Sequence, residues 1–151
     1  MGIFRGQGAT EYLVLLAVVL IVALVSVALL GFFPGMASDA RITQSQSYWR
    51  GQARPFAILD SSISATAGTF SIQNMESTGL TMTTIAVGNG TNSSLNTAFG
   101  AGETKTVYIT QAIGAYSAGS IYDLGVNITY TTPNIVGAKQ YGTKNLIGKY
   151  T

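Results

Sequence analysis

Residues 7–33 read QGATEYLVLLAVVLIVALVSVALLGFF, and the interpretation of the whole chain depends on this stretch. From Tyr12 to Phe33 it is apolar apart from Ser26 and Gly31. At about 1.5 Å per residue, a helix of this length reaches roughly 30 Å, the thickness of the hydrocarbon core of a bilayer. Because the run is apolar on every side, the predicted helix must lie in lipid or be wrapped by other apolar helices.

A single carboxylate, Glu11, interrupts the pattern at the point where the apolar run begins. A charge at the edge of an apolar span is costly unless it has a partner, which makes such a residue a functional candidate. Glu11 is therefore the first candidate site residue. The alternative is that its carboxylate simply lies among lipid head groups.

Composition favours an exported β-rich domain after the helix and gives no support to an enzyme. Charged residues make up 9% of the 151, against roughly 25% in typical soluble domains. The net charge of +2 is scattered, so no basic patch predicts a nucleic-acid partner. The absence of cysteine and histidine removes disulfides, thiolate zinc sites and the commonest general base, and we expect no cofactor or metal. The carboxylates beyond the apolar run show no spacing typical of a hydrolytic pair or a calcium loop.

The first six residues, MGIFRG, allow two interpretations. In the first they stay attached, and the apolar helix is a signal anchor with Arg5 held inside the cell. In the second the chain is cut before the apolar run, so that the hydrophobic helix remains on the mature protein. A basic residue, Gly6 and then a new N-terminus at Gln7, with Glu11 as the fifth mature residue, supports the second interpretation.

The motif R-G-Q-G-A-T-E-Y-L followed by a long apolar run resembles the class III signal peptide of archaeal type IV pilins. The resemblance covers about the first 35 residues. It implies that a prepilin peptidase cuts between Gly6 and Gln7, and that Glu11 holds the position of the family's glutamate at mature residue five. It also implies an assembly ATPase and a membrane platform as partners, and a homopolymeric surface filament used for adhesion. The alternative function is that of a membrane-anchored extracellular β-domain acting as a monomeric binding or cell-envelope protein.

Gly31, Pro34 and Gly35 mark a weak point in the predicted stem, which spans residues 7–51. Proline lacks an N–H and disfavours helix at the residue before it, so we expect a kink or a short melted segment here. A second, more polar helical piece then runs to about Gly51. Its aromatic residues, Tyr48 and Trp49, are expected to pack between stem and head rather than at a membrane boundary.

Residues 54–151 are predicted to form a small antiparallel β-sandwich-like head, which makes the fold class α+β. Short alternating runs separated by Gly, Asn and Ser favour strands joined by turns. The expected strands are 56–59, 69–73, 80–87, 104–110 and one long strand 121–131 with a bulge at Gly125, followed by a final strand or hairpin over 137–142 and 146–150. Gly88-Asn89-Gly90 predicts a tight turn. The head also has pieces similar to archaeal pilin β-domains, such as GETKTV and NITY.

Three sequons of the form N-x-S/T make Asn89, Asn92 and Asn127 candidate N-glycosylation sites. Asn89 and Asn92 fall in a predicted exposed loop, whereas Asn127 lies within a predicted strand. Sugars there would help a surface of low charge to stay soluble. The tyrosines of the head are expected to serve packing, with a stacking platform for a glycan or DNA as the minor alternative.

Overall fold

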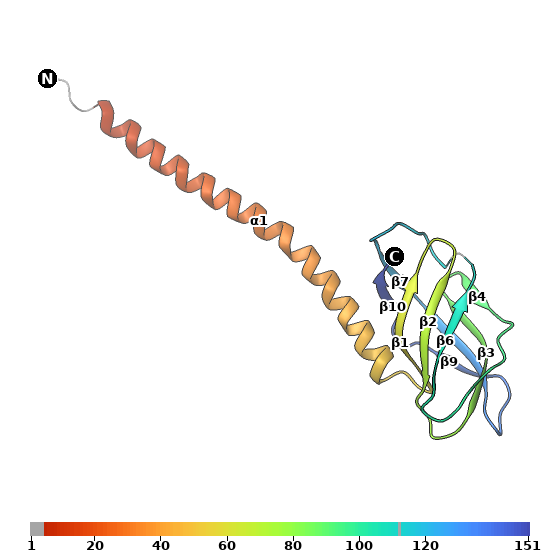
Figure 1. The fold of residues 1–151 in the computed structure, drawn as a ribbon. Coiled ribbons are helices and arrows are strands. Elements are labelled where there is room, and N and C mark those ends of the chain that lie inside the picture. Colours follow the sequence, from red (N-terminus) through yellow and green to blue (C-terminus); the bar gives the residue numbers. More distant parts are fainter. Residues whose placement is uncertain (1–4, 112) are drawn as a thin grey trace. The chain divides into compact units, whose positions relative to one another are not determined.

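The computed structural model describes residues 5–111 and 113–151, and it places one long helix before ten strands (Figure 1). The helix, α1, spans Arg5–Gly51. The strands are β1 (Phe56–Ile63), β2 (Gly68–Asn74), β3 (Leu80–Val87), β4 (Gly90–Asn92), β5 (Thr97–Phe99), β6 (Thr104–Ile109), β7 (Ile121–Leu124), β8 (Val126–Thr131), β9 (Ala138–Tyr141) and β10 (Leu146–Lys149). All strand pairs are antiparallel. The predicted α+β class is therefore confirmed.

By its internal contacts the chain divides into two compact units, and the boundary lies inside α1. The first, here called the helix unit, ends at Ala40, and the second, the head unit, spans Arg41–Thr151. The last part of α1 thus belongs with the strands, whereas the sequence placed the start of the head at residue 54. The reason is that Ser45, Tyr48 and Trp49 are buried among head residues.

α1 passes through Gly31, Pro34 and Gly35 without a break in its helical structure. The expected melted segment is therefore not found, and the second helical piece is the continuation of the first. Proline removes one backbone hydrogen bond and adds a local clash. Leucine is the commonest residue of the apolar run that precedes it, and leucine has a high helix propensity, which favours continuation. Flexibility of the stem at these residues stays a prediction.

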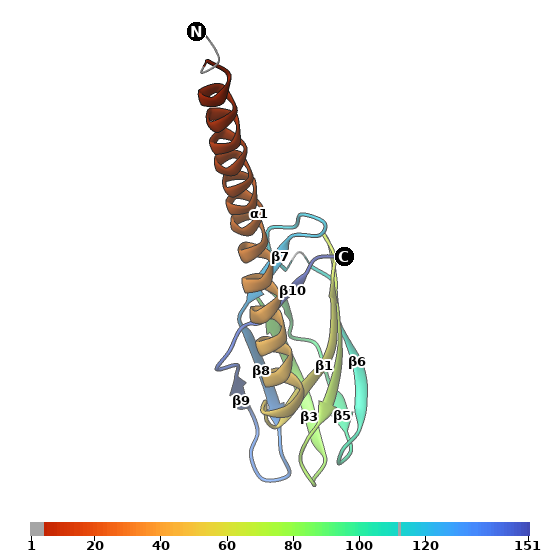
Figure 2. The ribbon, with the colours of Figure 1, turned by 90° about the vertical axis from the view of Figure 1, so that its left-hand side faces the viewer.

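The strands of the head unit form three sheets that share one core. The first has the order β1-β2-β6, and the second pairs β10 with β7. The third has the order β4-β3-β8-β9, with β5 also paired to β3. Figure 2 shows the strands of the first and third sheets running alongside one another. Buried residues of all three sheets belong to a single cluster that includes Phe56, Phe70, Met82, Ile128 and Leu146.

Strand β3 shows how the sequence sets the register of this core. Its buried apolar residues are Leu80 and Met82, then Ile85 and Val87, so the alternation shifts by one residue in the middle of the strand. A one-residue shift sends side chains to the opposite face unless the backbone absorbs the extra residue. The pairing of β3 with β8 has an irregularity between Met82 and Thr84, which is where the shift falls. The irregularity therefore keeps all four side chains in the core.

The region 121–131 differs from the prediction of one long strand. It forms two strands, β7 and β8, which lie in different sheets because the chain leaves one sheet at Gly125 and enters the other. The two final strands are found close to their expected bounds, but they do not pair with each other, since β9 pairs with β8 and β10 with β7. The short strands β4 and β5 were not predicted. Three residues are too few for an alternation to be recognised.

Candidate functional site

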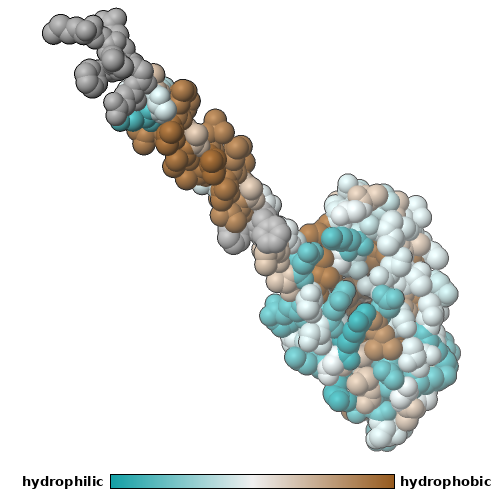
Figure 3. All heavy atoms as spheres, turned by 60° about the vertical axis from the view of Figure 1, so that its left-hand side comes forward, coloured by the Kyte–Doolittle hydropathy of each residue, from teal (hydrophilic) through white to brown (hydrophobic). Residues whose placement is uncertain are grey.

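The helix unit presents an apolar surface to its surroundings. The large hydrophobic side chains from Tyr12 to Leu30 are exposed, with exposed fractions of 48–70%. In Figure 3 the corresponding part of the helix is almost entirely brown, the colour of hydrophobic residues. The helix is long and apolar enough to cross a membrane. Side chains of this kind are stable only in lipid or against other apolar surfaces.

Glu11 lies in α1 at the beginning of this surface, and its side chain is exposed. It is the only charged residue between positions 6 and 38. Gly6 and Gln7, the residues of the predicted cleavage site, fall within the first turns of α1, whereas residues 1–4 of the predicted leader lie outside the described residues. About one helical turn separates position 7 from position 11, so a charge at a new N-terminus would lie close to the Glu11 carboxylate.

The three sequon asparagines lie in different surroundings. Asn89 is exposed in the two-residue turn between β3 and β4, where Gly88 has φ +54°. The predicted turn is thus confirmed, and glycine is required because that φ strains other residues. Asn92 is half-buried, and its Nδ2 donates to the carbonyl oxygen of Tyr108 at 2.8 Å. Asn127 is exposed on β8.

Tyr48 and Trp49 confirm the expectation that the end of α1 packs on the head. Tyr48 is 9% exposed and Trp49 is 1% exposed, and both belong to the core cluster. The Trp49 ring lies against the backbone of Gly142, where an added Cβ would come within 2.5 Å of Cζ2. The Tyr48 hydroxyl accepts a hydrogen bond from the N–H of Thr143 at 3.2 Å.

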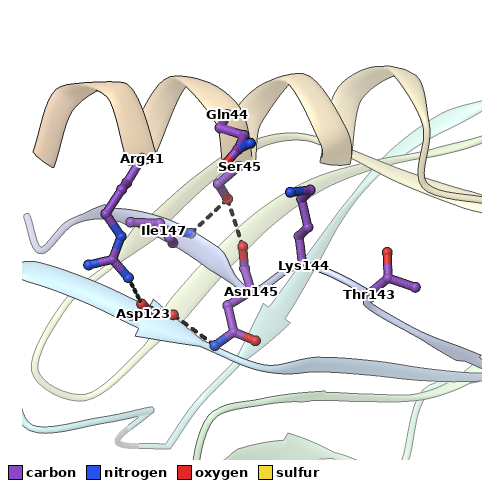
Figure 4. Close-up of a pocket in the computed structure, with 8 residues that line it drawn as sticks. All are labelled: Arg41, Gln44, Ser45, Asp123, Thr143, Lys144, Asn145 and Ile147. Carbon is purple, nitrogen blue, oxygen red and sulfur yellow. Dashed lines mark hydrogen bonds and ion pairs between the residues drawn. The ribbon is translucent and has the colours of Figure 1, made fainter. Parts of the chain in front are cut away.

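Polar contacts, drawn in Figure 4, join the same part of α1 to β7 and β10. The buried hydroxyl of Ser45 donates to the carbonyl oxygen of Asn145 at 2.8 Å and accepts from the N–H of Ile147 at 2.9 Å. Arg41 forms an ion pair with Asp123 at 2.5 Å, and the Asn145 side chain donates to the other oxygen of that carboxylate at 2.7 Å. This set could not be predicted from the sequence, because its helix residues lie 82–102 residues from their partners near the C-terminus and carry no motif.

Tyr122 and Glu103 of the head unit have shifted pKa values. Burial raises the pKa of Tyr122, whose hydroxyl lies 3.0 Å from that of Ser61. The hydrogen bond from the N–H of Gly100, with help from Lys105, lowers the pKa of Glu103. Both shifts follow from local structural contacts. Within residues 5–111 and 113–151, no group of three or more acidic, histidine or cysteine side chains could hold a metal ion.

The candidate site thus consists of an exposed apolar helix with one carboxylate at its start, together with a head unit on which the sequon residues Asn89 and Asn127 are exposed. A scan against protein-family models and a search of curated proteins find no match for the chain, so these contacts and exposures are what any functional assignment must rest on.

Proposed function

We propose that this chain is a structural subunit, a pilin, of an archaeal type IV pilus-like surface filament. In this proposal the apolar helices form the filament core and the β-rich heads form its outer surface. The observation that carries it is the exposed apolar surface from Tyr12 to Leu30 with Glu11 as the one charge at its start. Before assembly the helix lies in the membrane, and after assembly it lies against the helices of other copies.

Assembly exchanges lipid contacts for helix–helix contacts. Lipid tails are as apolar as leucine, so the hydrophobic effect alone does not drive this exchange, and close packing supplies the attraction. Glu11 would set the axial position of each subunit relative to its neighbours. Cleavage after Gly6 would leave an α-ammonium on Gln7, and opposite charges attract far more strongly in an apolar medium than in water. Pairing of Glu11 with its own or a neighbour's N-terminus would then help to fix the axial position of each subunit.

The proposal includes partners and a surface role. A prepilin peptidase would cut between Gly6 and Gln7, and an assembly ATPase with a membrane platform would extract the subunit from lipid. The filament would serve adhesion. Sugars on Asn89, Asn92 or Asn127 would cover a head surface of low charge.

Substitution of Glu11 tests the assembly step. We expect Glu11→Ala and Glu11→Gln to insert into the membrane normally but to give no filaments, or filaments of altered helical register, by electron microscopy of cell-surface material. Tyr12→Phe is the matched control, because it changes an adjacent exposed side chain and keeps the carboxylate. Normal filaments from both Glu11 variants would rule out the proposed role of this residue.

The N-terminus of the mature surface protein tests the processing step. We expect sequencing and intact mass to give a chain that starts at Gln7. A surface protein that starts at Met1 or Gly2 would contradict the filament proposal and favour a membrane-anchored monomer.

A further inference from the structure

A hollow of about 340 Å³ opens on the head unit where three distant segments meet. One segment precedes β1, the second is the loop between β2 and β3 with the start of β3, and the third is the end of β8. The lining includes Arg54, Pro55, Glu76, Thr78, Leu80 and Tyr130. The volume lies at the lower end of the range of small-molecule sites, roughly 300–1,000 Å³.

The polar wall of this hollow is held by a fully buried asparagine, Asn74. Its Nδ2 donates to the carbonyl oxygens of Thr78 at 2.8 Å and Gly100 at 3.0 Å, and its Oδ1 accepts from the N–H of Glu76 at 3.0 Å. These bonds fix the backbone of the loop that carries Glu76 and Thr78. The loop therefore needs little ordering when a ligand binds, and preorganisation of this kind favours affinity.

Arg54 and Glu76 present a donor and an acceptor at a separation that suits a bridging hydroxyl. Arg54 Nη1 donates to the carbonyl oxygen of Met75 at 3.0 Å, which holds the guanidinium in place. The same nitrogen lies 4.0 Å from Glu76 Oε1, too far for a direct hydrogen bond. A hydroxyl group placed between them can accept from the guanidinium and donate to the carboxylate. The two charges cancel, which favours a neutral ligand over an ion.

The remaining lining combines two threonines with Pro55, Leu80 and Tyr130. The Tyr130 ring packs edge-on against Phe56 with ring centroids 5.6 Å apart, and Phe56 itself is fully buried. Pro55 and Leu80 line the same hollow. The hollow therefore offers convergent polar groups beside a proline and an aromatic ring, and aromatic side chains with placed polar groups are found in small-molecule sites.

We infer that this hollow binds a neutral saccharide, with Arg54 and Glu76 bridging its hydroxyls and the side chains of Pro55 and Tyr130 contacting its C–H face. A sugar offers neighbouring hydroxyls that match the donor and acceptor, together with an apolar face that matches the rings of Pro55 and Tyr130. The binding step itself does not depend on the proposed filament. In a filament the site would be repeated along the surface, and multivalency would turn a weak single-site affinity into firm attachment.

The test is saturation-transfer NMR on the full chain in dodecylphosphocholine micelles, a detergent without a sugar head group. Glucose, mannose, galactose and N-acetylglucosamine serve as probes at millimolar concentration. We expect saturable transfer to at least one of them, and at least tenfold weaker binding to Glu76→Gln and to Arg54→Gln. The matched control is Asp60→Asn, which removes an exposed carboxylate outside the hollow and should bind as the unsubstituted chain does.

Two results would overturn the inference. One is the absence of saturable transfer with all four sugars, and the other is unchanged affinity in the Glu76 and Arg54 variants, which would leave these residues as a surface ion pair only. Chemical-shift mapping on the unsubstituted chain adds a check that needs no variant, since shifts centred outside residues 54–55, 76–80 and 130 would also contradict the assignment. The measurement uses unassembled protein and does not require filaments. A negative result would therefore contradict the saccharide site without bearing on the proposed filament.

Discussion

The side-chain amide of Gln140 forms two hydrogen bonds with the main chain of Phe56. Its Oε1 accepts from the Phe56 N–H at 3.0 Å, and its Nε2 donates to the Phe56 carbonyl oxygen at 2.8 Å. Gln140 lies on β9 and Phe56 on β1, the edge strands of two different sheets. The amide thus replaces the backbone partner that an adjacent strand would provide, and it joins the two sheets at one side of the core.

Replacement of this amide should destabilise the head unit strongly. Gln140 is 6% exposed and Phe56 is fully buried, so Gln140→Leu leaves a buried N–H and a buried carbonyl without partners. We expect a loss of about 2–4 kcal/mol in the free energy of unfolding, measured by urea denaturation of the full chain in micelles. Gln73→Leu is the matched control, because Gln73 makes one exposed hydrogen bond to Gly102. An equal effect of the two substitutions would show that the junction between the two sheets does not depend on Gln140.

Ser45 provides a second test, at the junction between α1 and the strands. Ser45 is 2% exposed, and its hydroxyl bonds both the carbonyl oxygen of Asn145 and the N–H of Ile147. Ser45→Ala should therefore lower the free energy of unfolding by about 1–3 kcal/mol, because two backbone groups lose their partner. Ser47→Ala, two residues along the same helix at an exposed position, should change it by less than about 0.5 kcal/mol. Comparable losses in the two variants would contradict the role of the hydroxyl.

The strands with clear alternation could be predicted from the sequence, whereas the pairing between them could not. The run from Leu80 to Val87 was predicted with the bounds that the structure has, because its apolar residues and the glycine turn after it carry local signals. The run from Ile121 to Thr131 was misread as one strand. Alternation continues through Gly125, and only the three-dimensional pairing shows that the chain changes sheets there.

Among the candidate sites, those formed by one short stretch of sequence could be predicted, whereas those formed by distant segments could not. Glu11, the apolar helix and the sequons were evident from short stretches of the sequence. The hollow of Arg54, Glu76 and Tyr130 was not, because its residues come from three segments and converge only after folding. Pro34 is the converse case. It is a strong local signal for a helix end, yet α1 continues through it.

Gly142 should tolerate no side chain, because the Trp49 ring occupies the space. A Cβ at this position would lie 2.5 Å from Cζ2 and 2.7 Å from Cη2 of Trp49. We expect Gly142→Ala to cost about 1–3 kcal/mol of unfolding free energy through overpacking, and to shift the fluorescence of the only tryptophan in the chain. Gly79→Ala is the control, because its nearest non-neighbouring atom would be 3.6 Å away. Unchanged stability and fluorescence in Gly142→Ala would contradict the observed packing.

If the head carries N-linked sugar, Asn89 should be more fully modified than Asn92. Asn89 is exposed in a turn, whereas Nδ2 of Asn92, the atom that a sugar would occupy, donates to the Tyr108 carbonyl oxygen across the gap between β4 and β6. Peptide mass spectrometry of surface protein should show sugar mass on residue 89 and little on residue 92. In protein made without sugar, Asn92→Gln should destabilise the head by about 1 kcal/mol and Asn89→Gln by almost nothing. Higher occupancy at residue 92 would contradict this order.

Glu103 makes the stability of the head depend on pH in a direction that its contacts determine. The Gly100 N–H and Lys105 lower its pKa below the usual value of 4.5, so the folded state favours the carboxylate more than the unfolded chain does. The stabilisation is fully present above the unfolded pKa and is lost as the pH falls through the lowered folded value. The Tm difference between the unsubstituted chain and Glu103→Gln should therefore be constant from about pH 6 to 8 and shrink below about pH 4.5. A difference that grows on acidification would contradict the assigned contacts.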